Sequence, residues 1–193
     1  MLRRLYDWTM SLAATRHAEK ALFGVSFAES SFFPIPPDVL LIPMVIAKPK
    51  QWIRFALVCT IASVLGAFLG YAIGMFLYEL IGQPILALYG AENSFNQIAE
   101  WYNTWGGWGV LFAAITPFPY KVLTIFSGAT GLNFVVFTVV SIIGRAARFF
   151  LVAWLLGRYG EPIRIFIEKY LGLLFTLFMV LLLGGFYLVK FAF

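Results

Sequence analysis

The sequence predicts an all-α integral membrane protein with two re-entrant, broken-helix hairpins, about three transmembrane helices and interfacial amphipathic helices. First, 62% of the 193 residues are hydrophobic and only 12% are charged, whereas soluble domains have about 25% charged residues. Second, two proline-containing apolar stretches, residues 34–42 and 117–125, are near-copies of each other. Third, ionisable residues lie inside the apolar segments. A soluble fold of this length could not bury so much apolar surface, so a single membrane domain over residues 1–193 is expected.

The first two elements are an interfacial helix and a hairpin. Residues 1–20 carry apolar residues at helical spacing and predict a helix in the membrane interface, with an ordinary surface helix as the alternative. Residues 21–47 are apolar but contain Pro34, Pro36 and Pro37. Each interior proline removes a backbone hydrogen bond, and irregular backbone at membrane depth is tolerated only inside protein or beside a wet cavity. A helix–break–helix hairpin that enters and leaves on one side is therefore expected.

The second half of the chain repeats this organisation. Residues 84–106 carry Trp and Tyr along one face and predict an interfacial helix. Residues 107–131 predict the second hairpin, broken at Pro117 and Pro119. The two proline motifs are offset by 83 residues, from Pro34 to Pro117. A duplicated broken hairpin of this kind is typical of membrane transporters.

Three transmembrane helices complete the predicted architecture, over residues 52–81, 134–157 and 171–189. If both hairpins are re-entrant, ten basic residues fall on one side of the membrane and two on the other. The positive-inside rule then places the N-terminus in the cytoplasm. Small residues recur every four positions of the first span and predict close helix packing there; they are Ala62, Gly66, Gly70 and Gly74.

Five ionisable residues lie at membrane depth, where a charge costs at least about 2.5 kcal/mol; they are Glu29, Asp38, Lys121, Arg145 and Arg148. Asp38 and Lys121 occupy equivalent positions of the two proline motifs, and Arg145 and Arg148 share one helix face. The net positive sum predicts phosphate binding by Lys121, Arg145 and Arg148, assisted by half-helix N-termini. Glu29 and Asp38 are candidates to carry a proton. Structural ion pairs, Asp38 with Lys121 and Glu29 with an arginine, are the alternative, and the two roles can coexist.

Other functional classes find little support in the composition. His17 and Cys59 are the only residues of their kinds, so a His-based catalytic centre, a multi-His metal site and an intrachain disulfide lack material. Neither enzymatic activity nor a metal or cofactor is expected. The net charge of +5 does not predict nucleic-acid binding, because the basic residues sit at the ends of apolar runs. No signal peptide is expected at the N-terminus.

The segment Glu29-Ser30-Ser31-Phe32-Phe33-Pro34-Ile35-Pro36-Pro37-Asp38 resembles the acidic hairpin motif of the DedA family, also called the SNARE-associated or VTT-domain family. Gly66-x-x-x-Gly70-Tyr71-x-x-Gly74 is similar to the family's glycine stripe, and Gly128-Ala129-Thr130-Gly131 to the end of its second hairpin. The stretch Pro117-Phe118-Pro119-Tyr120-Lys121 resembles the YqaA-like branch. The likeness departs at Thr116 and Val122, where typical members carry arginine, and Arg145 and Arg148 are candidates to compensate.

This resemblance implies a bacterial cytoplasmic (inner) membrane protein with two opposed re-entrant hairpins. It also implies lipid translocation by a flippase or scramblase, with undecaprenyl phosphate or a phospholipid as substrate and with proton coupling through Glu29 and Asp38. The expected partners are membrane lipids and protons, with a homo-oligomer as an open option. Two other functions stay open: proton-coupled transport of a small ion or solute, and a non-transporting membrane scaffold.

Overall fold

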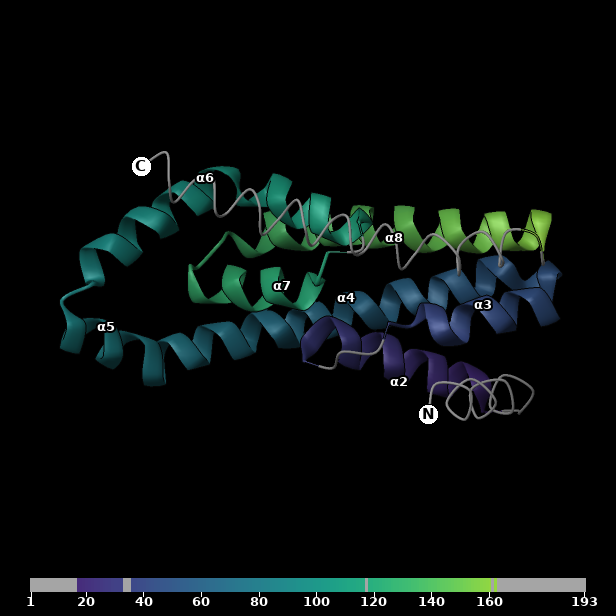
Figure 1. Ribbon diagram of the computed structural model, residues 1–193, viewed down its shortest axis with the longest axis horizontal. Helices are drawn as coiled ribbons and strands as arrows, with labels where there is room; N and C mark the ends of the chain where they lie inside the picture. The colour runs from purple at the N-terminus through teal and green to yellow at the C-terminus, as the bar shows by residue number, and fades with distance from the viewer. Residues whose placement is uncertain (1–16, 33–35, 117, 161, 163–193) are drawn as a thin grey trace.

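The computed structural model describes residues 17–32, 36–116, 118–160 and 162, and every element in these ranges is helical (Figure 1). The elements are α2 (Ala18–Ser31), α3 (Asp38–Ala47), the 3-10 turn η1 (Pro49–Gln51), α4 (Trp52–Leu77), the π-turn η2 (Tyr78–Gly82), α5 (Gln83–Tyr89), α6 (Glu92–Ile115), α7 (Tyr120–Ala129) and α8 (Phe134–Tyr159). The predicted interfacial helix over residues 1–20 lies largely outside the described residues, and the third predicted span, 171–189, lies wholly outside them.

Both halves of the chain follow the same order: a helix, a break, a short helix and a long helix. The first half consists of α2, α3 and α4, and the second of α6, α7 and α8. The short and long helices of the second half begin 82 residues after their counterparts in the first half. α7 begins at Tyr120 and α3 at Asp38, and α8 begins at Phe134 and α4 at Trp52. The internal repeat seen in the prolines therefore extends to the helices themselves.

Proline sets both breaks. α2 ends at Ser31 and α3 begins directly after Pro37, while α6 ends at Ile115 and α7 begins directly after Pro119. Proline fixes φ and lacks an N–H donor, so it starts a helix readily and favours the end of the one before it, although α3 continues through Pro43. The other predicted breakers are Pro36, which lies in the first break, and Pro34 and Pro117, which fall outside the described residues.

Residues 84–106 are not the single interfacial helix that the sequence predicts. α5 ends at Tyr89, Gly90 turns the chain with φ +62°, and α6 then begins. α6 runs without a break through Gly106 and Gly107, where the sequence places the start of the second hairpin. Glycine weakens a helix by about 1 kcal/mol but keeps its N–H donor, so it does not break a helix as proline does. The first arm of the second repeat is therefore the whole of α6.

Within the described ranges, two helical stretches are long and apolar enough to cross a membrane. One is Pro49–Tyr89, 41 residues in which α4 continues through η2 into α5, and the other is Phe134–Tyr159, which is α8. Pro84 does not interrupt the first stretch because it sits in the first turn of α5, directly after the π-turn. Two of the predicted spans thus correspond to α4 and α8, although the first continues beyond its predicted end at residue 81.

The two halves are interleaved around α4 and α8, which pack against each other. Each first arm packs along the long helix of its own half, α2 on α4 and α6 on α8. The short second arms contact the long helix of the other half, α3 meeting α8 and α7 meeting α4. In Figure 1, α2 and α3 lie toward one end of the molecule and α6 and α7 extend toward the other. The two breaks therefore share the centre of the molecule.

A strip of small residues on α4 lets both neighbouring helices approach closely; it consists of Ala62, Gly66, Gly70 and Gly74. A Cβ atom at Gly66 would overlap the backbone carbonyl of Phe27 in α2. A Cβ atom at Gly74 would overlap the backbone carbonyl of Ile125 in α7. One face of α4 thus accepts an arm from each repeat, at distances that only glycine allows.

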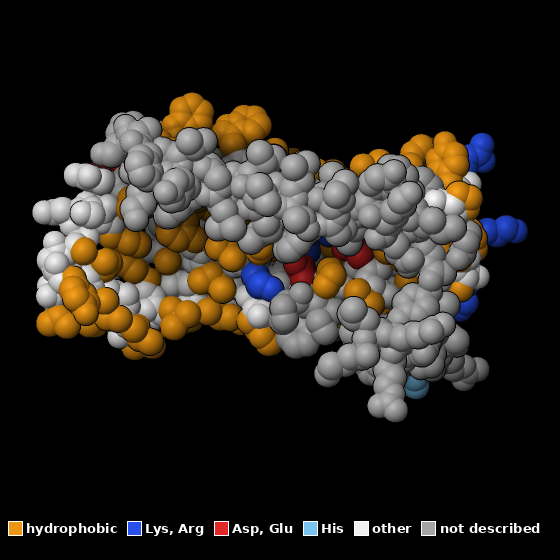
Figure 2. Space-filling view, in the orientation of Figure 1, with side chains coloured by type: hydrophobic (Ala, Val, Ile, Leu, Met, Phe, Trp, Pro, Cys, Tyr) orange, Lys and Arg blue, Asp and Glu red, His pale blue; other side chains and the backbone are white. Residues whose placement is uncertain are grey.

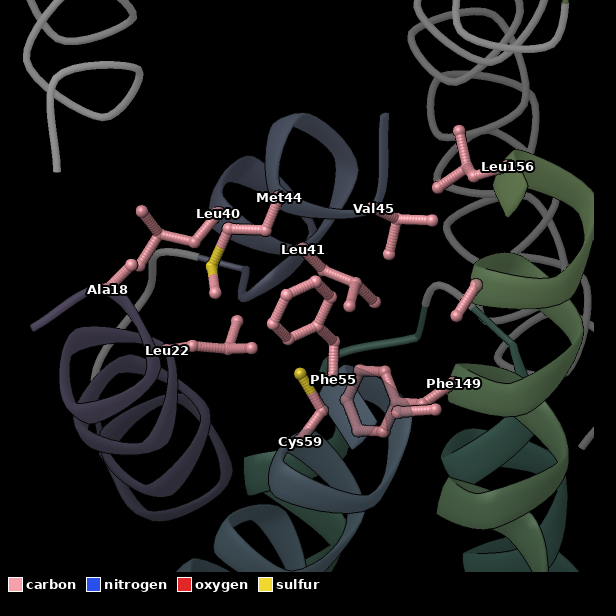
Figure 3. Packing of buried hydrophobic residues seen from close by; sticks show 12 residues of the cluster. Ala18, Leu22, Leu40, Leu41, Met44, Val45, Phe55, Cys59, Phe149 and Leu156 are labelled. Carbon is pink, nitrogen blue, oxygen red and sulfur yellow. The ribbon is translucent and has the colours of Figure 1, made fainter. Parts of the chain in front are cut away.

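Buried apolar side chains form one core in each half. The first core joins α2, α3, α4 and α8, and includes Leu22, Phe55 and Phe149 (Figure 3). The second core joins α4, α6, α7 and α8, and includes Tyr120 and Phe137. Four of these five side chains are 0% exposed, and Phe55 is 2% exposed. The two cores hold the arms of the repeats in place on either side of the breaks.

Exposed basic side chains gather at the end of the molecule where α3 leads into α4 and where α8 ends; they are Lys48, Lys50, Arg54 and Arg158. Figure 2 shows lysine and arginine side chains at this end. Residues 55–120, which form most of the opposite end, contain no lysine or arginine. The described part of the chain therefore has a strong charge asymmetry along its long axis.

Candidate functional site

α8 carries a polar face at the centre of the molecule. Ser141, Arg145 and Arg148 are four and then three residues apart, so they lie on one side of this otherwise apolar helix. Arg145 is fully buried, and the side chain of Arg148 is 17% exposed. Figure 2 shows basic and acidic side chains together near the middle of one face, among hydrophobic ones. Charges in such surroundings need partners.

Arg145 joins α8 to α2 and α4. Its Nη2 forms a 2.5 Å ion pair with Glu29 Oε2 and donates to Ser30 Oγ at 3.1 Å. Its Nε donates to Ser63 Oγ at 2.5 Å, and the hydroxyls of Ser30 and Ser63 bond to each other. The arginine that pairs with Glu29 is therefore Arg145, and the charge is neutralised inside the protein.

The guanidinium of Arg145 also lies between the two apolar cores. Its central carbon is 4.6 Å from the ring centre of Tyr120 and 4.8 Å from that of Phe149. A guanidinium is attracted to the faces of aromatic rings, and more strongly where water is excluded. Arg145 is thus held by hydrogen bonds from Nε and Nη2 to polar side chains. Its guanidinium also contacts one aromatic ring from each core, Phe149 in the first and Tyr120 in the second.

Arg148 connects the two breaks. Its Nη2 forms a 2.7 Å ion pair with Asp38 Oδ2, at the first residue of α3. Its Nη1 donates to the backbone carbonyl of Thr116 at 3.1 Å, directly after the end of α6. Carbonyls at a helix C-terminus lack an intrahelical partner, so the Thr116 carbonyl in the second break is available as an acceptor. One side chain therefore binds a group from each break.

Lys121 is the third predicted basic residue of the site. It is the second residue of α7, is partly exposed, and stands where the repeat places Asp38 in the first half. Asp38 pairs with Arg148, whereas the alternative interpretation of the sequence, structural ion pairs, joins Asp38 to Lys121. The reason is tertiary: α3 packs against α8, so the carboxylate at its first residue meets the polar face of α8.

Buried hydroxyl groups satisfy backbone carbonyls around the site. Ser31 Oγ donates to the carbonyl of Gly66 at 2.9 Å, and Thr124 Oγ1 donates to the carbonyl of Ser30 at 3.2 Å. These bonds tie the end of α2 to α4 on one side and to α7 on the other.

The site also contains residues that the sequence analysis missed. Ser63 bonds to Arg145, and Tyr120 and Ser141 lie beside it. Ser63 precedes Gly66 by three residues and Ser141 precedes Arg145 by four, so each lies one helical turn from a predicted residue. A search for polar residues one helical turn from each predicted site residue would have found both.

The chemistry available here is that of exchangeable ion pairs. Among the residues that the structure describes, no group of three or more His, Cys, Asp or Glu side chains could hold a metal ion. Two carboxylates and two guanidiniums are paired, and the Arg148 pair is open to the surface on both partners, with 17% and 14% exposure. An anion that reaches Arg148 could replace Asp38, because guanidinium donors suit carboxylate and phosphate equally.

Known proteins resemble this chain over nearly its whole length. The VTT domain matches residues 35–159. An uncharacterized protein of Haemophilus influenzae is 37% identical over 186 residues, 96% of each chain. A protein of Histophilus somni is 40% identical over 168 residues, 85% of this chain and 87% of its own. No solved structure gives a significant match. The chain therefore belongs to the VTT-domain, or DedA, family of membrane proteins.

Proposed function

We propose that this protein moves an anionic, phosphate-bearing lipid between the leaflets of the bacterial cytoplasmic membrane. Undecaprenyl phosphate and anionic phospholipids are the substrate class. The observation that carries the proposal is the position of Arg148, which binds Asp38 of the first break and the carbonyl of Thr116 in the second. A group that draws Arg148 away from these partners loosens both breaks at once.

The first step in this mechanism is an exchange of ion pairs. Protonation of Asp38 removes its negative charge and weakens its hold on Arg148, so a lipid phosphate can take its place. Lys121, at the start of α7, supplies a second positive charge from the other repeat. The first turns of α3 and α7 both face the breaks, and their N–H groups favour an anion. The headgroup thus bridges the two repeats.

Arg145 has an inner role in this mechanism. Its full burial and its bonds to Glu29, Ser30 and Ser63 support a role in holding the end of α2 rather than in first contact with the headgroup. When Glu29 takes up a proton, Arg145 loses its counter-charge and becomes able to receive the phosphate. The two pairs would then act in sequence, the outer Arg148 pair before the inner Arg145 pair.

The proposed topology has both hairpins re-entering the bilayer, from opposite sides. The exposed lysines and arginines at one end of the molecule support a cytoplasmic location for that end. α2 and α3 both begin or end there, and α6 and α7 extend toward the other end (Figure 1). The N-terminus is then cytoplasmic, and the two breaks meet near the bilayer midplane.

The test is headgroup translocation by purified protein in liposomes. Fluorescent anionic phospholipid and labelled undecaprenyl phosphate are followed at two pH values for the wild type, Asp38→Asn and Arg148→Ala. Arg54→Ala is the matched control, because Arg54 is exposed and pairs with Glu19 at the surface. The expected result is protein-dependent flux that Asp38→Asn and Arg148→Ala abolish and Arg54→Ala retains.

Two outcomes would point to the other functions. Flux of protons or a small ion without lipid movement, sensitive to the same substitutions, would make the protein a proton-coupled transporter. Absence of any flux from folded protein would favour a membrane scaffold. Normal lipid flux in folded Arg148→Ala protein would remove Arg148 from the mechanism.

A further inference from the structure

Three buried polar atoms at the centre of the molecule make no direct hydrogen bond of ordinary geometry to any residue that the structure describes, although two of them, the hydroxyls of Tyr120 and Ser141, lie near each other. They are the hydroxyl of Tyr120, Oγ of Ser141 and Nη1 of Arg145. All three side chains are completely buried. Buried polar groups in folded proteins are nearly always bonded to protein or to ordered water. Three buried polar atoms that lack such a bond are therefore unusual in a folded protein.

The three atoms belong to one region between α7 and α8. Ser141 and Arg145 are one turn apart on the same face of α8, and the guanidinium of Arg145 lies over the ring of Tyr120, the first residue of α7. Nε and Nη2 of Arg145 form the edge that contacts Ser63 and Glu29. Nη1 is not part of that edge, so its N–H groups do not contribute to the bonds with Ser63 and Glu29.

We propose that these three groups hold one ordered internal water molecule between α7 and α8. An internal water typically makes about three hydrogen bonds to groups that would otherwise be unsatisfied. The water accepts a hydrogen bond from Nη1 of Arg145. It can donate to or accept from each of the two hydroxyls, because a hydroxyl can act as donor and as acceptor. The site therefore matches the hydrogen-bonding capacity of water on every side.

The charge and enclosure of the site favour water over an anion. Arg145 is already paired with Glu29, so a second anion would leave a net negative charge in the interior. The guanidinium lies over the rings of Tyr120 and Phe149, and no exposed surface remains on Arg145, Tyr120 or Ser141. A neutral ligand such as water leaves the charge of the Arg145–Glu29 pair balanced.

This water gives the buried arginine a second, adjustable partner. This role of the water rests on the proposed function, in which Glu29 gains and loses a proton beside Arg145. A water on the other side of the same guanidinium can turn its oxygen toward the positive charge when the carboxylate is neutral. The contact also links the first residue of α7 to α8, so a movement of the second arm changes the surroundings of Arg145.

Radiolytic hydroxyl-radical footprinting tests for the water directly, because radicals formed from a bound water label side chains that bulk solvent cannot reach. The expected result is labelling of Tyr120 several-fold above that of Phe137, which is equally buried and belongs to the same core. Labelling in ¹⁸O-enriched water identifies the source of the oxygen. Equal protection of Tyr120 and Phe137 would overturn the proposal.

A double-mutant cycle of unfolding free energies gives the second test. Tyr120→Phe and Ser141→Ala each remove one partner of the water, so their effects are expected to be non-additive. Tyr120→Phe with Ser26→Ala is the control pair, because Ser26 bonds to the carbonyl of Cys59 instead. Additive effects of Tyr120 and Ser141 would contradict a shared water, and coupling without labelling of Tyr120 would mean a direct hydroxyl pair. Neither readout involves lipid, so the proposal can fail while translocation stands, and the reverse.

Discussion

Arg148 and Asp38 form a 2.7 Å ion pair between residues that are 110 positions apart in the sequence. The arginine belongs to the long helix of the second repeat, and the aspartate opens the short helix of the first. Because Arg148 also binds the carbonyl of Thr116, this pair links the breaks of both repeats.

Removal of either partner of the outer pair should destabilise the protein, and removal of both should cost less than the sum. Asp38→Asn or Arg148→Gln leaves one charge unpaired in a mostly apolar region, with an expected loss of about 1–3 kcal/mol each. The double variant leaves two neutral side chains that can bond to each other. Thermal or denaturant unfolding in detergent measures the cycle, and strictly additive losses would contradict the pairing.

Arg145 should matter more for folding than Arg148. Its charge partner Glu29 is 14% exposed and Arg145 itself is fully buried, so Arg145→Ala leaves an uncompensated carboxylate inside and is expected to cost about 3–5 kcal/mol. The exposed Arg54→Ala variant should change stability by no more than about 1 kcal/mol. The unfolding midpoints of the two purified variants decide this. Similar midpoints for Arg145→Ala and Arg54→Ala would show that the inner pair does not stabilise the fold.

The glycine strip of α4 should reject a single added methyl group. Gly74→Ala places a Cβ on the backbone carbonyl of Ile125, so α7 must move away from α4, at an expected cost of about 1–3 kcal/mol. Gly24→Ala in α2 is the matched control, since a Cβ there meets nothing within 4 Å. That change should stabilise the helix by about 0.5–1 kcal/mol. If both alanines shift the unfolding midpoint in the same direction, the close packing of α7 on α4 is not required.

The first hairpin should return to the side from which it enters. Lys20 and Lys50 are exposed and flank α2 and α3, while Ser94 is exposed near the start of α6. In a re-entrant topology, cysteines at positions 20 and 50 react with an impermeant thiol reagent from the cytoplasmic side, and a cysteine at 94 reacts from the other side. The buried Cys59 is first replaced by serine. Labelling of positions 20 and 50 from opposite sides would mean that this hairpin crosses the membrane.

The sequence was most informative where proline dictated the backbone. Pro37 and Pro119 each precede a short helix in the structure, because a missing N–H donor acts locally and needs no tertiary information. The unbroken passage of α6 through Gly106 and Gly107 was not foreseen, since glycine only weakens a helix and packing decides the outcome. The residues inside the membrane segments could also be identified as candidates from their charge alone.

The pairing of those charges could not be obtained in the same way. The alternative of structural ion pairs joins Asp38 to Lys121, which occupies the equivalent position in the repeat, whereas the structure joins Asp38 to Arg148. Equivalence in a repeat describes which residues are related by symmetry, whereas a contact depends on which helices pack together. The contact of α3 with α8, which brings Asp38 to Arg148, is a property of the assembled fold.

The exchange of short helices between the halves has a consequence for how such a chain can be built. α3 contacts α8 and α7 contacts α4, so each half completes the packing of the other. A chain that contained only one repeat would leave the surface of its long helix uncovered and its short helix without that support. Such a half-length protein would have to fold as a pair of copies inserted in opposite orientations, with each copy supplying the arm that the other lacks.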